Sequence, residues 1–123
     1  MKISFSKKER NLSKNSIDNL HQYGSRIYGQ SLILIWDYIE HQTTVPIQLL
    51  ITVPKKKIKK AVDRNYIKRI IREIYRLNKP EIHSLVSKPI EIIIRYNKTS
   101  VPEFNKLKSE LLNLLNHDSF KQN

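Results

Sequence analysis

Three short apolar runs stand out from an otherwise polar chain and predict the strands of a sheet. They are SLILIWDYI (31–39), IQLLITV (47–53) and IEIIIRY (90–96). Each run is rich in Ile, Leu, Val and aromatic residues, and each is too short for a typical helix. The segment SRIY (25–28) adds a possible short strand before Gly29. We therefore expect a sheet of three or four strands.

Two segments with apolar residues at helical spacing predict the first two helices. Residues 13–24 have Ser13 at the position of an N-cap and Gly24 at the position of a C-terminal stop. A longer helix is expected over 61–78, since Pro80 disfavours helical backbone at the residue before it.

A third helix is predicted at the end of the chain, over 101–116. Pro102 suits its first turn, and five leucines form a wide apolar stripe along it. The residues that follow, 117–123, are expected to fray. Residues 40–46 are interpreted as a polar connection between two strands.

The order of these elements is helix, two or three strands, helix, strand, helix. Such an order is typical of an α+β sandwich, in which a mixed sheet packs against helices. The length of 123 residues fits one domain spanning 1–123, because two domains would each be too small to bury a good core. Residues 1–12 are interpreted as a flexible basic arm.

Composition excludes several classes of protein. The chain has no cysteine, which rules out a disulfide scaffold and cysteine-ligated zinc. No run approaches the ~20 apolar residues that span a bilayer, and the N-terminus lacks the apolar stretch of a secretory signal. We expect a cytoplasmic protein with no membrane partner and no obligate protein partner.

The charge is strongly basic and unevenly distributed. Lys and Arg number 23 against 11 Asp and Glu, a formal net charge of +12. Residues 55–76 hold ten basic residues against Asp63 and Glu73, and residues 1–14 hold five against Glu9. These two segments account for the whole excess. A local excess of this kind indicates a polyanionic partner, nucleic acid first, although a lysine-rich solubilising face is the alternative.

The helix predicted over 61–78 is amphipathic in an informative way. At about 100° per residue, the isoleucines at 67, 70, 71 and 74 and Leu77 fall on one arc, and the cations fall on another. The cationic arc holds Arg64, Lys68, Arg69, Arg72 and Arg76, with Asn65 among them. Spaced four residues apart, such cations repel one another until an anion binds. Calmodulin or membrane binding remains an alternative for a basic amphipathic helix.

No constellation of residues suggests catalysis by the protein. The four histidines at 21, 41, 83 and 117 are scattered over different elements, and no cluster of carboxylates suggests a metal site. With only two glycines, a Gly-rich phosphate loop is excluded. We predict no catalytic residue, no metal ligand and no cofactor bound by the protein.

The run KKKIKKAVDRNYIKRIIRE (55–73) resembles the signature of the bacterial ribonuclease P protein component. The resemblance is strong over 53–77 and weaker over nearly the whole chain. It implies an α-β-β-β-α-β-α fold of the ribosomal protein S5 domain 2-like type, with a left-handed βαβ crossover. It also implies a protein that binds a catalytic RNA through its basic helix, while Mg²⁺ ions used by that RNA carry out the hydrolysis. The substrate implied is precursor tRNA, whose 5′ leader is removed.

The resemblance also implies a set of binding residues. Those for the catalytic RNA are Lys55, Lys56, Lys57, Lys59, Lys60, Arg64, Asn65, Lys68, Arg69, Arg72 and Arg76. Those for a cleft that holds the leader are Ile17, His21 and Trp36. Trp36 has core packing as its alternative role, and His21 a solvated one. Tyr66 stands where the family has a second arginine.

A non-catalytic RNA-binding module, such as a ribosomal or assembly protein, is the main alternative function. It shares the same electrostatics but would not stimulate cleavage of precursor tRNA. A DNA-binding helix protein is third, because a reader of the major groove needs directional side chains, and the exposed arc offers mainly Asn65.

Overall fold

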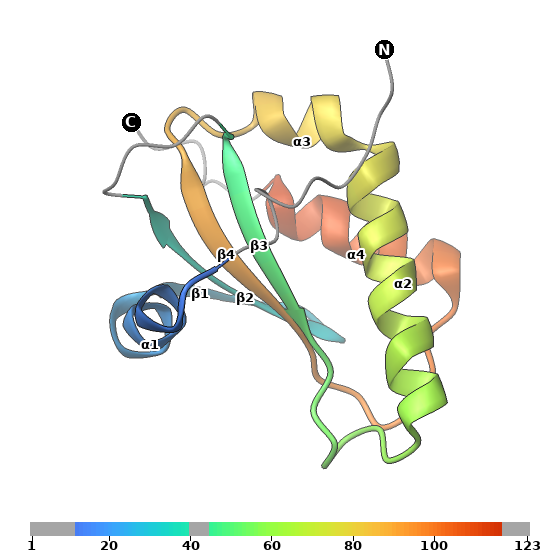
Figure 1. The fold of residues 1–123 in the computed structure, drawn as a ribbon. Helices are drawn as coiled ribbons and strands as arrows, with labels where there is room; N and C mark the ends of the chain where they lie inside the picture. Colours follow the sequence, from blue (N-terminus) through green and yellow to red (C-terminus); the bar gives the residue numbers. More distant parts are fainter. Residues whose placement is uncertain (1–11, 40–44, 117–123) are drawn as a thin grey trace.

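The computed structural model of the protein describes residues 12–39 and 45–116 (Figure 1). Within these residues, helices and strands alternate along the chain. The elements are α1 (Lys14–Tyr23), β1 (Ser25–Tyr28), β2 (Leu32–Tyr38), β3 (Ile47–Thr52), α2 (Ala61–Leu77), α3 (Lys79–Ser84), β4 (Ile90–Tyr96) and α4 (Phe104–Leu115). The predicted α+β fold and its order of elements are confirmed, with α3 as an addition. The connection at 40–44, most of the basic arm and the tail at 117–123 lie outside the described residues.

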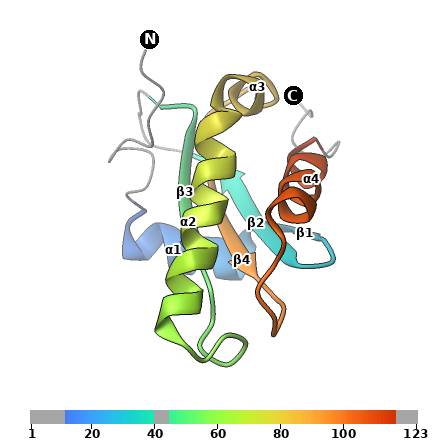
Figure 2. The same cartoon turned by 90° about the vertical axis from the view of Figure 1, so that its right-hand side faces the viewer.

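The strands form one mixed sheet in the order β1-β2-β4-β3. Strands β1, β2 and β4 pair antiparallel, while β3 and β4 pair parallel. In Figure 2, α2 lies in front of the sheet, both parallel strands run downward, and β4 lies to the right of β3. The β3-α2-β4 crossover is therefore left-handed, against the usual right-handed preference.

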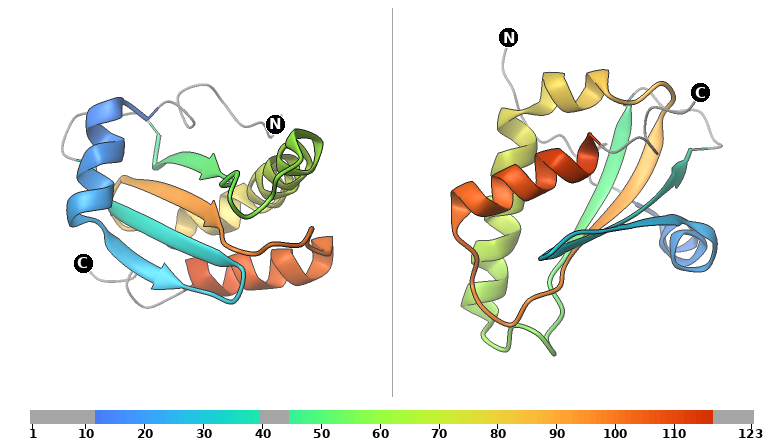
Figure 3. Two further views of the ribbon diagram at one scale, coloured as in Figure 1. Left: turned by 90° about the horizontal axis from the view of Figure 1, so that it is seen from below. Right: turned by 180° about the vertical axis from the view of Figure 1, so that it is seen from behind.

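Helices cover the two faces of the sheet unequally. Helices α2 and α4 lie on one face and α1 crosses the other (Figures 1 and 3). The face toward α2 and α4 holds the larger core, to which all four strands contribute. The face toward α1 holds a small cluster of Leu20, Ile35 and Ile93, with Ile17, Ile33 and Leu50 packed against it. Alternation along β2 and β4 thus sends successive residues into two different cores.

Helix α1 is short but well bounded. The Ser13 hydroxyl accepts a hydrogen bond from the backbone N–H of Ser16 at 3.1 Å, which caps the helix as predicted. Gly24 ends it, and the Gly24 N–H donates to the Leu20 carbonyl at 2.9 Å. The bounds predicted for this helix and for β4 agree with the structure.

Two predicted helix boundaries need correction, and a proline is involved in each. The chain does not leave helical structure after Asn78, because α3 begins at once with Pro80 in its first turn. Proline is tolerated there because its missing N–H would have no partner inside the helix. Conversely, Pro102 lies outside α4, which begins at Phe104 with Glu103 as N-cap. No helix in the described ranges is long and apolar enough to cross a membrane.

Gly24 should be required for the packing of α1 on the sheet. A Cβ at this position would lie 2.6 Å from the Leu20 carbonyl oxygen and 2.9 Å from Ile35 Cγ2, and neither the backbone nor a core side chain can yield cheaply. We expect Gly24→Ala to lower the free energy of unfolding by about 1–3 kcal/mol. Urea denaturation measures this, with Ser25→Ala at the exposed neighbouring position as control. Equal stability of the two variants would contradict the close approach.

Candidate nucleic-acid interface

The lysines that precede α2 are held in a compact turn, residues 54–60, which we call the lysine turn. The Pro54 carbonyl accepts hydrogen bonds from the backbone N–H groups of Lys57 and Ile58, each at 3.1 Å. Ile58 is 4% exposed and joins the larger core. A buried side chain therefore anchors the turn from within. Of its five lysines, Lys57 is half-buried and the others are exposed.

Arg64, in the first turn of α2, ties the lysine turn to the helix. Its Nη1 donates to the carbonyl oxygen of Ile58 at 3.0 Å and to that of Lys59 at 2.8 Å. Both acceptors lie in the lysine turn. The side chain that sequence assigned to RNA thus also makes intramolecular contacts.

A basic cavity lies beside the lysine turn. Its volume is about 350 Å³, and its lining residues are Lys56, Lys57, Ile58, Lys59, Lys60, Asp63, Thr99 and Val101. Four ammonium groups on one small cavity produce a strongly positive local potential, which Asp63 offsets only in part. A phosphate group is the kind of ligand that such a cavity suits.

The outward face of α2 carries most of the predicted cations. Asn65, Arg69 and Arg72 are exposed, while Arg64, Lys68 and Arg76 are partly exposed. The four isoleucines predicted to face the core are buried. The structure thus brings the helical cations and the lysine turn together along one helix and the loop that leads into it.

The predicted apolar arc of α2 is wrong at its C-terminal end. Leu77 is 54% exposed, whereas Tyr75, which falls within the cationic arc, is 1% exposed. Helix α3 explains the exchange, because the Tyr75 hydroxyl is hydrogen-bonded to His83 Nε2 of α3 at 2.8 Å. The cationic face is therefore interrupted near its end.

Arg76 is paired within the protein. Its Nη2 lies 2.7 Å from Glu73 Oε2, and its Nε donates to both carboxylate oxygens. The hydrogen bonds from Arg76 lower the pKa of the Glu73 carboxyl, and the same bonds raise the pKa of Arg76. This cation is the one on the α2 face whose charge a neighbouring carboxylate offsets, among the ion pairs of the described residues.

Tyr66 also has a partner on the helix surface. Its ring is 40% exposed, and the Arg69 guanidinium carbon lies 5.5 Å from the ring centroid. The distance is that of a cation–π contact. The residue that replaces the family arginine therefore positions a neighbouring arginine.

Trp36 does not belong to the predicted cleft. Its side chain is 5% exposed and packs in the core between the sheet and α2 and α4, with its ring edge-on to Tyr38 at 5.2 Å. Ile17 and His21 lie on α1, against the opposite face of the sheet. The prediction that the three residues line one cleft is wrong for Trp36, since side chains alternate between the faces of a strand.

The α1 face of the sheet carries two different rows of side chains. Helix α1 packs over the middle of the face through Leu20. Strand register places one row toward the end of the sheet where the lysine turn lies, and we call it the cationic row; its members are Tyr28, Ile33, Arg95 and Thr52. The other row holds Asp37, Glu91 and Gln48 at the opposite end.

The cationic row includes residues that sequence reasoning missed. Tyr28 is 68% exposed, and Arg95 is partly exposed with no carboxylate paired to it among the described residues. The signal was present, because Arg95 breaks an isoleucine run at a position that alternation places on the same face as Ile93. An exposed ring beside an arginine suits a single-stranded nucleic acid. Ile17 is half-buried and His21 is exposed, and they share a face of α1 one turn apart.

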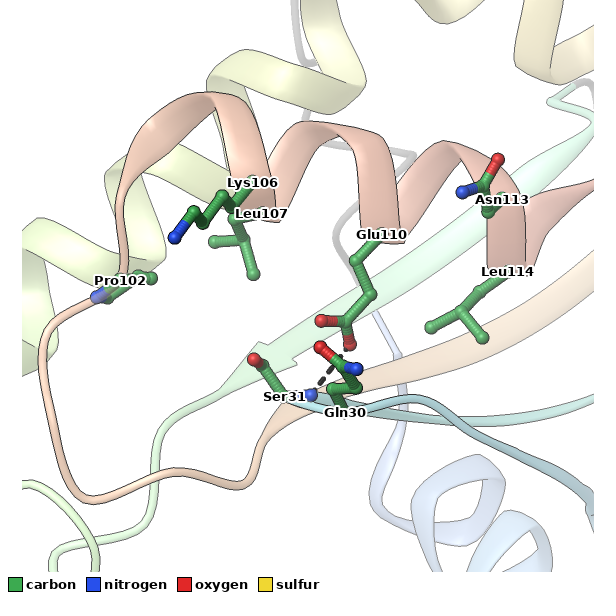
Figure 4. Close-up of a pocket in the computed structure, with 8 residues that line it drawn as sticks. All are labelled: Gln30, Ser31, Pro102, Lys106, Leu107, Glu110, Asn113 and Leu114. Carbon is green, nitrogen blue, oxygen red and sulfur yellow. Dashed lines mark hydrogen bonds between the residues drawn. The ribbon is translucent and has the colours of Figure 1, made fainter.

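A second cavity lies between α4 and the β1–β2 turn, and Figure 4 shows its lining. Its volume is about 450 Å³. Glu110 occupies its floor, where Oε2 accepts hydrogen bonds from the backbone N–H groups of Ser31 and Leu32, each at 2.8 Å. The carboxylate is thus committed to holding the turn, and its role is structural.

The residues described offer no assembled catalytic centre. His21 is on α1 and His83 on α3, while His41 and His117 lie outside the described residues. In the described ranges, no three His, Cys, Asp or Glu side chains come together as a metal site would require. The chemistry of this surface is that of binding.

Known proteins resemble this chain in sequence and in fold. The family model of ribonuclease P matches residues 5–118. The ribonuclease P protein component of Geotalea uraniireducens is 33% identical over 113 residues, covering 92% of this chain and 93% of that protein. That of Chlorobaculum tepidum is 42% identical over 69 residues, covering 54% of this chain and 45% of that protein.

Two solved structures share the fold. The ribonuclease P protein of Staphylococcus aureus superimposes with a TM-score of 0.74 at 20% identity, covering 94% of this chain and all of that one. That of Thermotoga maritima gives 0.70 at 25% identity, covering 88% and 96%. With a family model that matches almost the full length, the chain belongs to the ribonuclease P protein family, whose members are tRNA-processing subunits that associate with ribonuclease P RNA.

Proposed function

We propose that this chain binds the catalytic RNA of ribonuclease P and the 5′ leader of precursor tRNA, and so promotes removal of the leader. The observation that carries the proposal is the basic surface formed by the lysine turn and the outward face of α2. Its cations would neutralise phosphates of a folded RNA, which a rigid helix engages by shape and charge. Mg²⁺ bound by the RNA would carry out the hydrolysis, in the cytoplasm.

The leader would lie on the α1 face, along the cationic row. Tyr28 offers a ring for stacking of a base, and Arg95 offers a cation for a phosphate. Ile17 and His21 would border the strand from the side of α1. The row with Asp37 and Glu91 would repel phosphates, so it disfavours a path across the other half of the face.

The two binding surfaces are continuous. Strand β3 ends at Thr52, a member of the cationic row, and the chain enters the lysine turn two residues later. The end of the sheet therefore joins the leader surface to the surface for the catalytic RNA. A protein of this form would hold substrate and catalyst together, with its contribution in affinity and orientation.

The protein should stimulate cleavage of precursor tRNA at low Mg²⁺. We expect faster cleavage by ribonuclease P RNA from the same source when the protein is present, since cations that reduce phosphate repulsion lower the requirement for metal ions. Gel analysis of the released leader measures the rate, with RNA alone and protein alone as controls. Tight RNA binding without stimulation would favour a non-catalytic RNA-binding module. Cleavage by protein alone would indicate an active site on this chain.

The exposed cations of α2 should contribute individually to RNA affinity. We expect Arg72→Gln to weaken binding of the catalytic RNA and to reduce the slope of log K against log salt by about one. Lys106→Gln on α4 removes the same charge on a different helix and serves as the matched control. Filter binding over a salt series measures both quantities. Equal losses for the two variants would mean that only net charge matters.

Release of Arg76 from Glu73 should strengthen RNA binding. Glu73→Gln removes the carboxylate that pairs with Arg76 at 2.7 Å and leaves a cation available to phosphate. We expect affinity for the catalytic RNA to rise by roughly threefold, more than for Glu81→Gln, which removes an exposed carboxylate on α3. Unchanged or weaker binding by Glu73→Gln would place Arg76 outside the interface.

Arg95 should affect only substrates that carry a leader. We expect Arg95→Gln to weaken binding of precursor tRNA to the holoenzyme by roughly fivefold and to leave binding of mature tRNA unchanged, because mature tRNA has no strand to place on the cationic row. Lys106→Gln again controls for loss of charge, on the opposite face of the sheet. Equal weakening of both tRNAs by Arg95→Gln would exclude a leader contact.

A further inference from the structure

We infer that Arg64 is a positioning residue for the lysine turn, through which it sets the affinity for RNA. The inference rests on the proposed function and assigns this side chain a different role from the other arginines of α2. It is the arginine of that face whose recorded partners are backbone carbonyls, those of Ile58 and Lys59.

The lysine turn needs such support because it concentrates like charges. Four lysines line one cavity of about 350 Å³, and their mutual repulsion favours an open, extended segment. Three contacts oppose the repulsion: the Pro54 carbonyl with two N–H groups, the burial of Ile58, and the two bonds from Arg64. The first two act within the turn, and only Arg64 fixes it relative to α2.

The geometry suits arginine and not lysine. Nη1 reaches two successive carbonyl oxygens, at 3.0 and 2.8 Å, from a residue five or six positions further along the chain. A lysine ammonium carries the same charge but is a mobile point charge that lacks the fixed planar fork of a guanidinium. Arg64→Lys therefore separates position from charge. Arg72→Lys makes the same chemical change on the exposed face of the same helix and is the matched control.

The first test needs no RNA. Amide hydrogen exchange of Lys57 and Ile58, whose N–H groups donate to Pro54, reports the order of the lysine turn. We expect Arg64→Lys to accelerate this exchange by roughly tenfold while exchange in β4 stays unchanged, and Arg72→Lys to leave both unchanged. Equal exchange at the turn in the two variants would overturn the inference.

The second test is a double-mutant cycle in RNA binding. We expect Arg64→Lys to weaken binding of ribonuclease P RNA by roughly tenfold and Arg72→Lys by less than about threefold. If Arg64 acts through the lysine turn, its effect should largely disappear in a Lys59→Gln/Lys60→Gln background, whereas that of Arg72→Lys should persist. Additive effects of Arg64→Lys and the turn variant would show a direct contact with RNA and would overturn the inference.

Failure of the proposed function gives a different result from failure of this inference. A wild-type protein that does not stimulate cleavage would contradict the proposed function, whatever the exchange at the turn. A wild-type protein that stimulates cleavage, together with equal behaviour of Arg64→Lys and Arg72→Lys, would contradict only the role given to Arg64.

Discussion

Strand β4 is the constraint on which the other parts of the structure depend. It pairs with β2 on one side and β3 on the other, and its residues alternate between two cores. Ile92 and Ile94 face α2 and α4, while Ile93 faces α1. Burial of both faces of one strand thus fixes the basic helix to one layer and the first helix to the other. The two RNA-facing surfaces keep their relation because the same strand holds both.

The placement of charge follows from what the core can anchor. Each cationic element is adjacent to a buried side chain: Ile58 within the lysine turn, the isoleucines of α2 beneath its arginines, and Ile93 next to Arg95 along the chain. Repulsion among cations disfavours their ordered arrangement, and burial of these apolar side chains offsets it. A surface ordered in this way loses less conformational entropy on binding an anion than a flexible lysine tail does.

Sequence predicted the parts of the molecule that depend on short periodic patterns. The apolar runs, the capped helix at Ser13 and the isoleucine face of α2 all follow from local spacing. Trp36 was misplaced because resemblance assigned it by position in the chain, whereas strand alternation decides the face by a single residue. The exchange of Leu77 and Tyr75 was not predictable, because it depends on a short helix that packs back over α2. The cationic row required strand order and register, which no local pattern contains.

Helix α1 rests on a far smaller core than the helices on the other face. Its one fully buried side chain is Leu20, which packs with Ile35 and Ile93, whereas α2 buries five residues. An element with so little buried apolar surface opens locally at a lower free energy than the rest of the fold. The width of the surface between α1 and the cationic row is thus adjustable, while the lysine turn and α2 stay ordered. One protein can then accept leaders of many sequences without loosening its contact with the catalytic RNA.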